Sequence, residues 1–253
     1  MEGDAPPHRK KAPCQPPHQR SSQSRAFPAL PGTSASSPRS RPPTRFAPCV
    51  SPKELDDVER YTDFLAAQVE GLSNYVLVGD SYGAVISLTL ALRQPTGLRG
   101  LVLSGRFAAN PLPRWKNTAG RASHYVRGPL YRAGTLRYHA HSLASKFDRD
   151  AEVPHTRNDY RQLFIENTPA ASYSARVARV ISFDVRDQLA KVNIPTLLIT
   201  PEDDQLVGDQ AARELRQGLP NAREVVLPET GHMFRFTHPS LYGRTILEFL
   251  QDI

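Results

Sequence analysis

The most constraining feature of the sequence is a serine flanked by glycines, set between a predicted strand and a predicted helix. Residues 75–79 (YVLVG) form a short apolar run typical of a buried parallel strand, and residues 82–93 are mostly apolar, which predicts a buried helix. Between them lies Gly79-Asp80-Ser81-Tyr82-Gly83. A sharp strand-to-helix turn lifts the Ser81 hydroxyl off the sheet, and the glycines leave room for the tight backbone. The motif therefore predicts a nucleophilic serine.

The alternation of strand and helix continues along residues 51–253. A capping box, Ser51-Pro52-Lys53-Glu54, begins a predicted helix that Gly71 ends. Because short apolar runs alternate with helical segments, the sequence predicts an α/β fold with a doubly wound, mostly parallel sheet. Further strands are predicted at residues 98–104, 195–200 and 224–227, and further helices at residues 208–218 and about 240–250.

Residues 106–188 interrupt this pattern. The segment is polar, basic and aromatic, and its helical periodicity is weak, as in residues 160–165 (YRQLFI). We therefore expect a helical cap, inserted at about 106–188 into a core that spans residues 51–253.

Residues 1–50 differ in composition from the rest of the chain. They hold 11 of the 23 prolines and eight Lys or Arg against two acids, with no apolar periodicity. Such a segment cannot bury enough apolar surface to offset the chain entropy lost on folding, so we predict a disordered tail. A basic, proline-rich tail can also bind an acidic or SH3-like partner.

The charge and the apolar content of the chain argue against several classes of function. Outside the tail, 24 basic residues face 23 acidic ones, so the pI of 9.6 belongs largely to the tail and gives no case for nucleic-acid binding. No apolar run reaches the roughly 18 residues of a membrane span, and no secretory signal is recognisable. The two cysteines, Cys14 and Cys49, form no disulfide framework. We expect a soluble, cytoplasmic protein without a membrane partner; a homo-oligomer stays open.

A serine hydroxyl becomes an efficient nucleophile when a base lies beside it and an acid orients that base. The run Pro201–Val207 (PEDDQLV) follows the predicted strand 195–200, where open α/β sheets place functional groups. Gly231-His232 follows the predicted strand 224–227. The chain order is therefore serine, acid, histidine, which is the order expected for a nucleophile elbow on an α/β sheet.

These motifs resemble those of the α/β-hydrolase superfamily. The resemblance covers residues 51–253 and rests on the glycine-flanked Ser81, on Gly231-His232, and on PEDDQLV, which matches the family's G-x-x-D-x-x-V stretch with Pro201 in the glycine position. It implies that Ser81 is the nucleophile, His232 the base and Asp204 the acid. Asp203, one residue earlier, stays the alternative acid.

The resemblance further implies how charge is stabilised at the site. The backbone N–H of Tyr82 is expected to form one side of the oxyanion hole, with Gly79 and Gly83 completing the elbow. No cofactor or metal is required. His139 and His141 have no acid or cysteine cluster beside them, so we interpret them as exposed cap residues rather than metal ligands. His238 follows Thr237 instead of a glycine and is interpreted as a surface residue.

The resemblance also implies parts that the sequence does not supply. Members of the superfamily carry further strands before the nucleophile and an HG-type loop that donates the second oxyanion hydrogen bond. Only 80 residues precede Ser81, and they contain no His-Gly or Gly-Gly pair. Loss of one oxyanion donor lowers the rate about 10²–10³-fold. Three interpretations are open: a mistranslated or spliced N-terminus, which we favour, a degenerate non-catalytic relative, or a partner chain that completes the sheet.

The predicted function is acyl transfer to water by a serine hydrolase, with an esterase-like mechanism. The expected substrate is a small ester, thioester, lactone or amide chosen by the cap. A serine in place of an aspartate nucleophile argues against epoxide hydrolase and haloalkane dehalogenase chemistry. The alternatives are a non-catalytic α/β-hydrolase-like binding protein, an incomplete gene product without a full oxyanion hole, and an interaction protein that works through the basic tail.

Overall fold

The computed structural model describes most of the chain from residue 57 onward. The tail predicted at 1–50, the two cysteines and the capping box at Ser51 lie outside the described residues. The described residues are 57–112, 118, 129–168 and 170–253.

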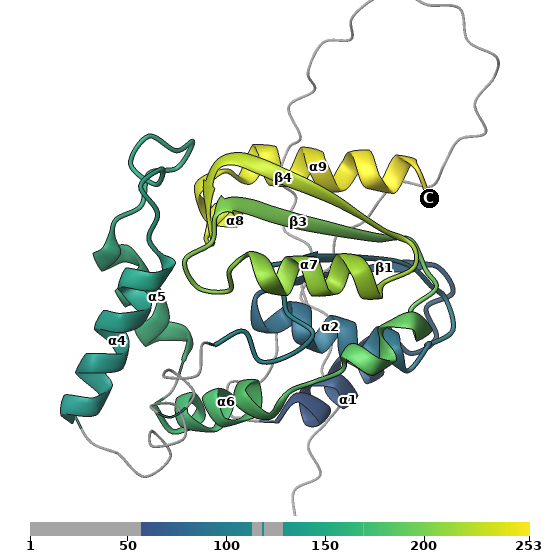
Figure 1. Ribbon diagram of the computed structural model, residues 1–253, viewed down its shortest axis with the longest axis horizontal. Helices are drawn as coiled ribbons and strands as arrows, with labels where there is room; N and C mark the ends of the chain where they lie inside the picture. The colour runs from purple at the N-terminus through teal and green to yellow at the C-terminus, as the bar shows by residue number, and fades with distance from the viewer. Residues whose placement is uncertain (1–56, 113–117, 119–128, 169) are drawn as a thin grey trace, which may run out of the picture. The chain divides into compact units, whose positions relative to one another are not determined.

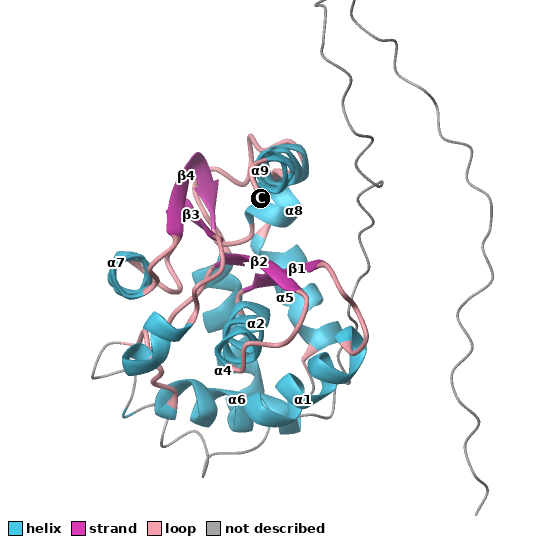
Figure 2. Cartoon of the chain, turned by 90° about the vertical axis from the view of Figure 1, so that its right-hand side faces the viewer, coloured by secondary structure: helices cyan, strands magenta, loops and turns pink. Residues whose placement is uncertain are grey.

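Four parallel strands form the sheet, in the order β1-β2-β3-β4 (Figures 1 and 2). Strands that follow each other along the chain also lie side by side, so each connection crosses back along the sheet. This arrangement confirms the predicted α/β fold with a parallel sheet. In the described part of the chain, β1 and β4 are the two edge strands. The strands are β1 (Tyr75–Asp80), β2 (Leu98–Ser104), β3 (Thr196–Asp203) and β4 (Ala222–Gly231).

Helices cover both faces of the sheet, which makes the fold doubly wound (Figure 2). Strand β2 shows the cause, because successive side chains of a strand point to opposite faces. Leu101 and Leu103 belong to the apolar core that contains α2, whereas Val102 packs in the core that contains Phe249. One face carries α1 (Val58–Val69), α2 (Tyr82–Leu92), the 3₁₀ helix η1 (Arg186–Lys191) and α7 (Asp209–Gly218); the other carries α8 (Phe234–Thr237) and α9 (Pro239–Gln251).

Two strands run further than the apolar runs predict. Strand β3 continues to Asp203 and β4 to Gly231, and these two residues are paired in the ladder. The prediction followed apolar side chains, whereas a ladder needs only backbone groups, so polar residues extend both strands. The extension brings the ends of β3 and β4 next to Asp204 and His232.

The segment between β2 and β3, for which a helical cap is predicted, contains three α-helices with described bounds, besides the 3₁₀ helix η1. Helix α5 begins with a capping box, in which Thr156 and Asp159 exchange side-chain and backbone hydrogen bonds. Helix α4 packs against α5 through His139, which stacks on Phe164 with 4.6 Å between ring centroids. The helices are α4 (Pro129–Leu143), α5 (Arg157–Asn167) and α6 (Ala170–Ser182) (Figure 1).

Gly79, in β1, sets how closely α2 can approach the sheet. A Cβ atom at Gly79 would lie 2.7 Å from each of Ala84 Cα, Gly83 O and Ser87 Oγ. Two of these atoms are backbone atoms, so a side chain at this position cannot be accommodated by rotation of a neighbour. Gly83 differs, because a Cβ there would meet nothing within 4 Å. Only the first glycine of the motif is therefore required for packing.

We predict that Gly79→Ala lowers the free energy of unfolding by about 1–3 kcal/mol, because the added methyl group forces α2 away from β1. Urea denaturation monitored by circular dichroism measures this loss. Gly83→Ala is the matched control and should change stability by less than about 1 kcal/mol, in the stabilising direction, since Ala favours a helix. Equal losses in the two variants would contradict the packing argument.

Candidate active site

Ser81 occupies the turn between β1 and α2 with a strained backbone. Its φ is 54° and its ψ is −120°, in a region that favours glycine. A non-glycine residue in such a conformation costs about 1–3 kcal/mol and persists only where its surroundings hold it. The Ser81 N–H donates a hydrogen bond of 2.8 Å to the Ser104 carbonyl, at the end of β2. The neighbouring strand thus fixes the turn that presents the hydroxyl.

His232 directly follows β4 and is buried, with 3% of its surface exposed. Its Nε2 lies 3.2 Å from Ser81 Oγ. The ring fits because Gly105, after β2, has no side chain: a Cβ there would lie 2.6 Å from His232 Cε1. Gly105 also has a φ of 54°, so the backbone and the close approach both require glycine.

Asp204 directly follows β3 and orients the histidine. Both of its carboxylate oxygens lie 3.0 Å from His232 Nδ1. The Leu206 and Val207 N–H groups donate to Asp204 Oδ1, at 3.0 and 2.9 Å, and hold the carboxylate in place. With the proton on Nδ1, the Nε2 atom is an acceptor for the Ser81 hydroxyl.

Asp203, the alternative acid, turns elsewhere. It accepts hydrogen bonds from Ser145 Oγ at 2.9 Å and from Gln205 Nε2 at 2.5 Å. Since Asp203 is the last residue of β3 and Asp204 the first beyond it, successive side chains diverge. The structure therefore brings Asp204 to His232, as the motif alignment implies.

His232 and Asp204 each shift the pKa of the other in the direction that favours its charged form. Burial alone would lower the pKa of His232, but the Asp204 carboxylate beside it outweighs burial and raises that pKa above its ordinary value of 6.5. Burial would raise the pKa of Asp204, but His232 and the two backbone donors lower it below its ordinary value. Asp204 is therefore a carboxylate at neutral pH, and it stabilises the protonated imidazole.

Tyr82 is the first residue of α2. The first N–H groups of a helix lack partners within the helix, and the helix dipole favours negative charge there. The predicted oxyanion donor, the Tyr82 N–H, therefore directly follows Ser81, in an orientation suited to an anion. Asp80, also in the elbow, accepts from Ser104 Oγ at 2.7 Å and pairs with Arg235.

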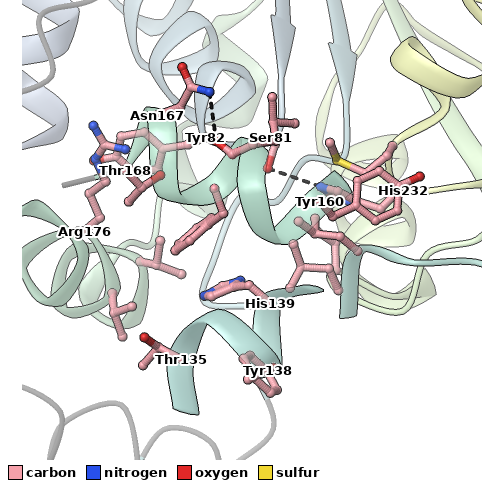
Figure 3. A pocket seen from close by; sticks show the side chains of 18 of the residues that line it. Ser81, Tyr82, Thr135, Tyr138, His139, Tyr160, Asn167, Thr168, Arg176 and His232 are labelled. Carbon is pink, nitrogen blue, oxygen red and sulfur yellow. Dashed lines mark hydrogen bonds between the residues drawn. The ribbon is translucent and has the colours of Figure 1, made fainter. Parts of the chain in front are cut away.

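A cavity of about 950 Å³ opens in front of Ser81 and His232 (Figure 3). The cap helices α4, α5 and α6 all contribute lining residues, so the cavity lies between the cap and Ser81. The lining is mainly aromatic and aliphatic, as is usual for small-molecule sites. Residues that line it include Phe107, Leu112, Tyr131, Tyr138, His139, Tyr160, Phe164, Arg176 and Val180.

The prediction that His139 is an exposed cap residue is wrong. It is partly buried, lines the cavity and stacks on Phe164. Burial, with a contribution from Arg132, lowers the pKa of His139 to about 4, so the ring is neutral at physiological pH. His141 is exposed, as expected, and His238 is only partly so, with its Nδ1 2.9 Å from Thr237 Oγ1.

Sequence reasoning missed Gly105, which makes room for the His232 ring, and several residues that line the cavity. Gly105 was detectable in principle, because a glycine immediately after a buried strand signals a special backbone. Arg176 and Tyr160 carried no motif. The apolar periodicity of α5, which holds Tyr160, is weak, and the clearer periodicity of α6 gives no signal for a charged residue that lines a cavity.

Neither a metal centre nor a membrane span is found among the described residues. They contain no group of three or more His, Cys, Asp or Glu side chains placed to hold a metal ion. None of the helices among them is long and apolar enough to cross a membrane.

A serine, a histidine and a carboxylate at the carboxyl ends of parallel strands, under a helical cap, define the class of α/β-fold hydrolases. A sequence model of the family described as alpha/beta hydrolase fold matches residues 28–239, and the chain belongs to this family. The match begins at residue 28, within the range predicted to be disordered and outside the residues that the structure describes.

Relatives of the chain carry hydrolase names. A protein of Pseudomonas savastanoi pv. phaseolicola named as a carbamate hydrolase, RutD, is 28% identical over 71% of this chain and 69% of its own length. A proline iminopeptidase of Thermoplasma volcanium is 24% identical over 69% and 64% of the two chains. A thermophilic esterase of Thermogutta terrifontis has the same fold, with a TM-score of 0.66 and 22% identity over 82% of this chain and 75% of its own. The chain is accordingly a hydrolase of this family.

We predict that the pKa of His232 lies above the ordinary histidine value of 6.5 and that the pKa of His139 lies below it. In NMR spectra of the imidazole groups, His232 should titrate above 6.5 and His139 near 4. In Asp204→Asn the carboxylate is lost and burial remains, so the pKa of His232 should fall below 6.5. An unchanged His232 titration in this variant would contradict the assigned contact.

Proposed function

We propose that the protein is a serine hydrolase that transfers an acyl group from a small substrate to water. The observation that carries the proposal is the line of contacts from Asp204 through His232 to Ser81, with the serine at a cavity that the cap helices line. Each residue type has the role that this chemistry requires: nucleophile, base and orienting acid.

The mechanism follows from the contacts. Ser81 Oγ attacks the substrate carbonyl while His232 Nε2 takes the hydroxyl proton. The Tyr82 N–H stabilises the oxyanion that forms. His232 then gives the proton to the leaving group, and an acyl–serine ester remains. Water attacks this ester with His232 again as base, which releases the acid and restores Ser81. Asp204 stabilises the imidazolium in both steps.

The substrate proposed is a small ester, thioester, lactone or amide. The cavity of about 950 Å³ has the size and the apolar lining for such a molecule. The names of similar proteins support the range: a carbamate hydrolase, an esterase, and Est816, an N-acyl homoserine lactone degrading enzyme with a TM-score of 0.66 and 20% identity over 79% of this chain and 77% of its own. A cytoplasmic location remains part of the proposal.

Ser81 reactivity tests the proposal directly. A fluorophosphonate probe phosphonylates an activated serine, so it should label the wild-type protein, and Ser81→Ala should abolish labelling. Circular dichroism checks that both proteins are folded. A folded wild-type protein that takes up no label would favour the non-catalytic binding protein instead.

The identity of the acid is tested by a pair of adjacent variants. Asp204→Asn should lower kcat by about 10³–10⁴-fold, because the imidazole loses its orientation and the stabilisation of its charge. Asp203→Asn, one residue away, should retain kcat to within about tenfold, since Asp203 contacts Ser145 and Gln205 rather than His232. The reverse order of effects would overturn the assignment.

The pH dependence has a definite sign. His232 acts as a base only in its neutral form, and its pKa lies above the ordinary value of 6.5. We therefore predict that kcat/KM rises with pH, falls off below that raised pKa, and reaches a plateau above it. Steady-state assays from pH 5 to 9 measure the profile, and a plateau that already extends below pH 6 would contradict it.

A further inference from the structure

One cation on the cavity wall lacks an acidic partner in the described part of the chain. Among the charged residues that line the cavity, Asp80 and Arg235 pair with each other, and His232 pairs with Asp204. Arg176, on α6, lines the same cavity, and no carboxylate of the described residues forms a salt bridge with it. The cavity therefore carries an uncompensated positive charge.

Aromatic rings fix the position of this guanidinium. Arg176 Cζ lies 5.6 Å from the centroid of the Tyr61 ring and 5.8 Å from that of Tyr82. Arg176 Nη2 donates a hydrogen bond of 2.6 Å to the Tyr61 hydroxyl. Figure 3 shows Ser81 between Arg176 on one side and His232 on the other. The Arg176 side chain is thus held in place in the same cavity that Ser81 lines.

Two buried hydrogen-bonding groups at this position have no partner in the described residues. One is Arg176 Nε, and the other is the hydroxyl of Tyr82. Burial raises the pKa of Tyr82 to about 12, so its hydroxyl stays protonated and can donate. Buried polar groups are paired in most folded proteins, so two orphaned donors on residues that line a cavity favour an acceptor that arrives with the ligand. Both atoms are fully buried, so the acceptor reaches them with a small movement of the Arg176 and Tyr82 side chains.

We infer that Arg176 binds a carboxylate group of the substrate, so that the enzyme acts on acyl compounds that carry an acid. The Nε and Nη2 N–H bonds of a guanidinium are parallel and match the two oxygens of a carboxylate, and Nη2 keeps a second hydrogen for Tyr61. The Tyr82 hydroxyl supplies a further donor. This inference rests on the proposed function and names its substrate class.

The carboxylate should lie a few bonds from the reacting carbonyl. Tyr82 follows Ser81 in the chain, and its ring contacts Arg176, so about one tyrosine side chain separates the cation from the nucleophile. A dicarboxylic acid esterified at one end spans such a distance. Arg176 is therefore a specificity-determining residue. The reacting atoms are contacted by Ser81 and His232 instead.

The test compares two esters that differ only in the terminal group. p-Nitrophenyl hydrogen adipate carries a carboxylate where p-nitrophenyl hexanoate carries a methyl group. We expect the wild-type protein to prefer the adipate ester in kcat/KM, and Arg176→Met to reduce this preference by about 10–100-fold, mainly through KM. Arg176→Lys, which keeps the charge, should retain part of it. Each variant is judged by the ratio of its kcat/KM values for the two esters. A general loss of activity lowers both values and leaves this ratio unchanged.

Arg179→Met is the matched control. Arg179 lies one turn further along α6, is exposed and pairs with Asp57. Its loss removes the same charge from the same helix but should leave the substrate preference unchanged. A wild-type protein that prefers the hexanoate ester, or an equal drop in preference in both variants, would overturn the inference.

A binding measurement separates this inference from the proposed catalysis. Calorimetric titration of adipate into Ser81→Ala should give a Kd that Arg176→Met, added to the same background, weakens at least tenfold. If no ester is hydrolysed but adipate still binds through Arg176, the catalytic proposal fails and the binding site stands. If adipate binds equally well to both proteins, the carboxylate site is refuted.

Discussion

The close approach of α2 to β1 at Gly79 is the constraint on which the site depends. With no Cβ at Gly79, the helix begins only two residues after the strand ends, and the chain makes the turn at Ser81 with a φ of 54°. The strain is local, and the large apolar core between α2 and the sheet offsets it. A looser helix would relax the turn, and the hydroxyl would no longer point at His232.

Three consecutive residues at the end of β2 and just beyond it connect the parts of the site. The Ser104 carbonyl accepts the Ser81 N–H, and Gly105 makes room for the His232 ring. Arg106 is buried and donates to the Ile199 carbonyl and Thr200 Oγ1 of β3, at 2.7 Å each. Its charge is compensated by Glu224, 3.2 Å away on β4. One tripeptide thereby ties Ser81, His232 and the strand that precedes Asp204 into a single arrangement.

The sequence predicted Ser81 and His232 better than the residues that line the cavity, for a physical reason. Strand and helix periods repeat over several residues, so the order of elements and the positions of Ser81 and His232 could be inferred from the residues alone. The choice of Asp204 over Asp203 depended on where β3 ends, which apolar content does not define. His139 was mispredicted because a cap helix buries its side chains against a cavity, and a cavity leaves no period in the sequence of α4.

In the proposed mechanism, Tyr82 links Ser81 to the choice of substrate. Its backbone N–H starts α2 beside Ser81, while its ring packs edge-on against Tyr61 of α1 and faces Arg176 of α6. Three helices therefore meet at the residue next to the nucleophile. Because the backbone and the ring belong to one residue, a shift of α1 or α6 moves the proposed oxyanion donor as well as the cavity wall. If Ser81 and Arg176 act as proposed, substrate selection and rate are coupled through this side chain, and changes in the cap are expected to affect both.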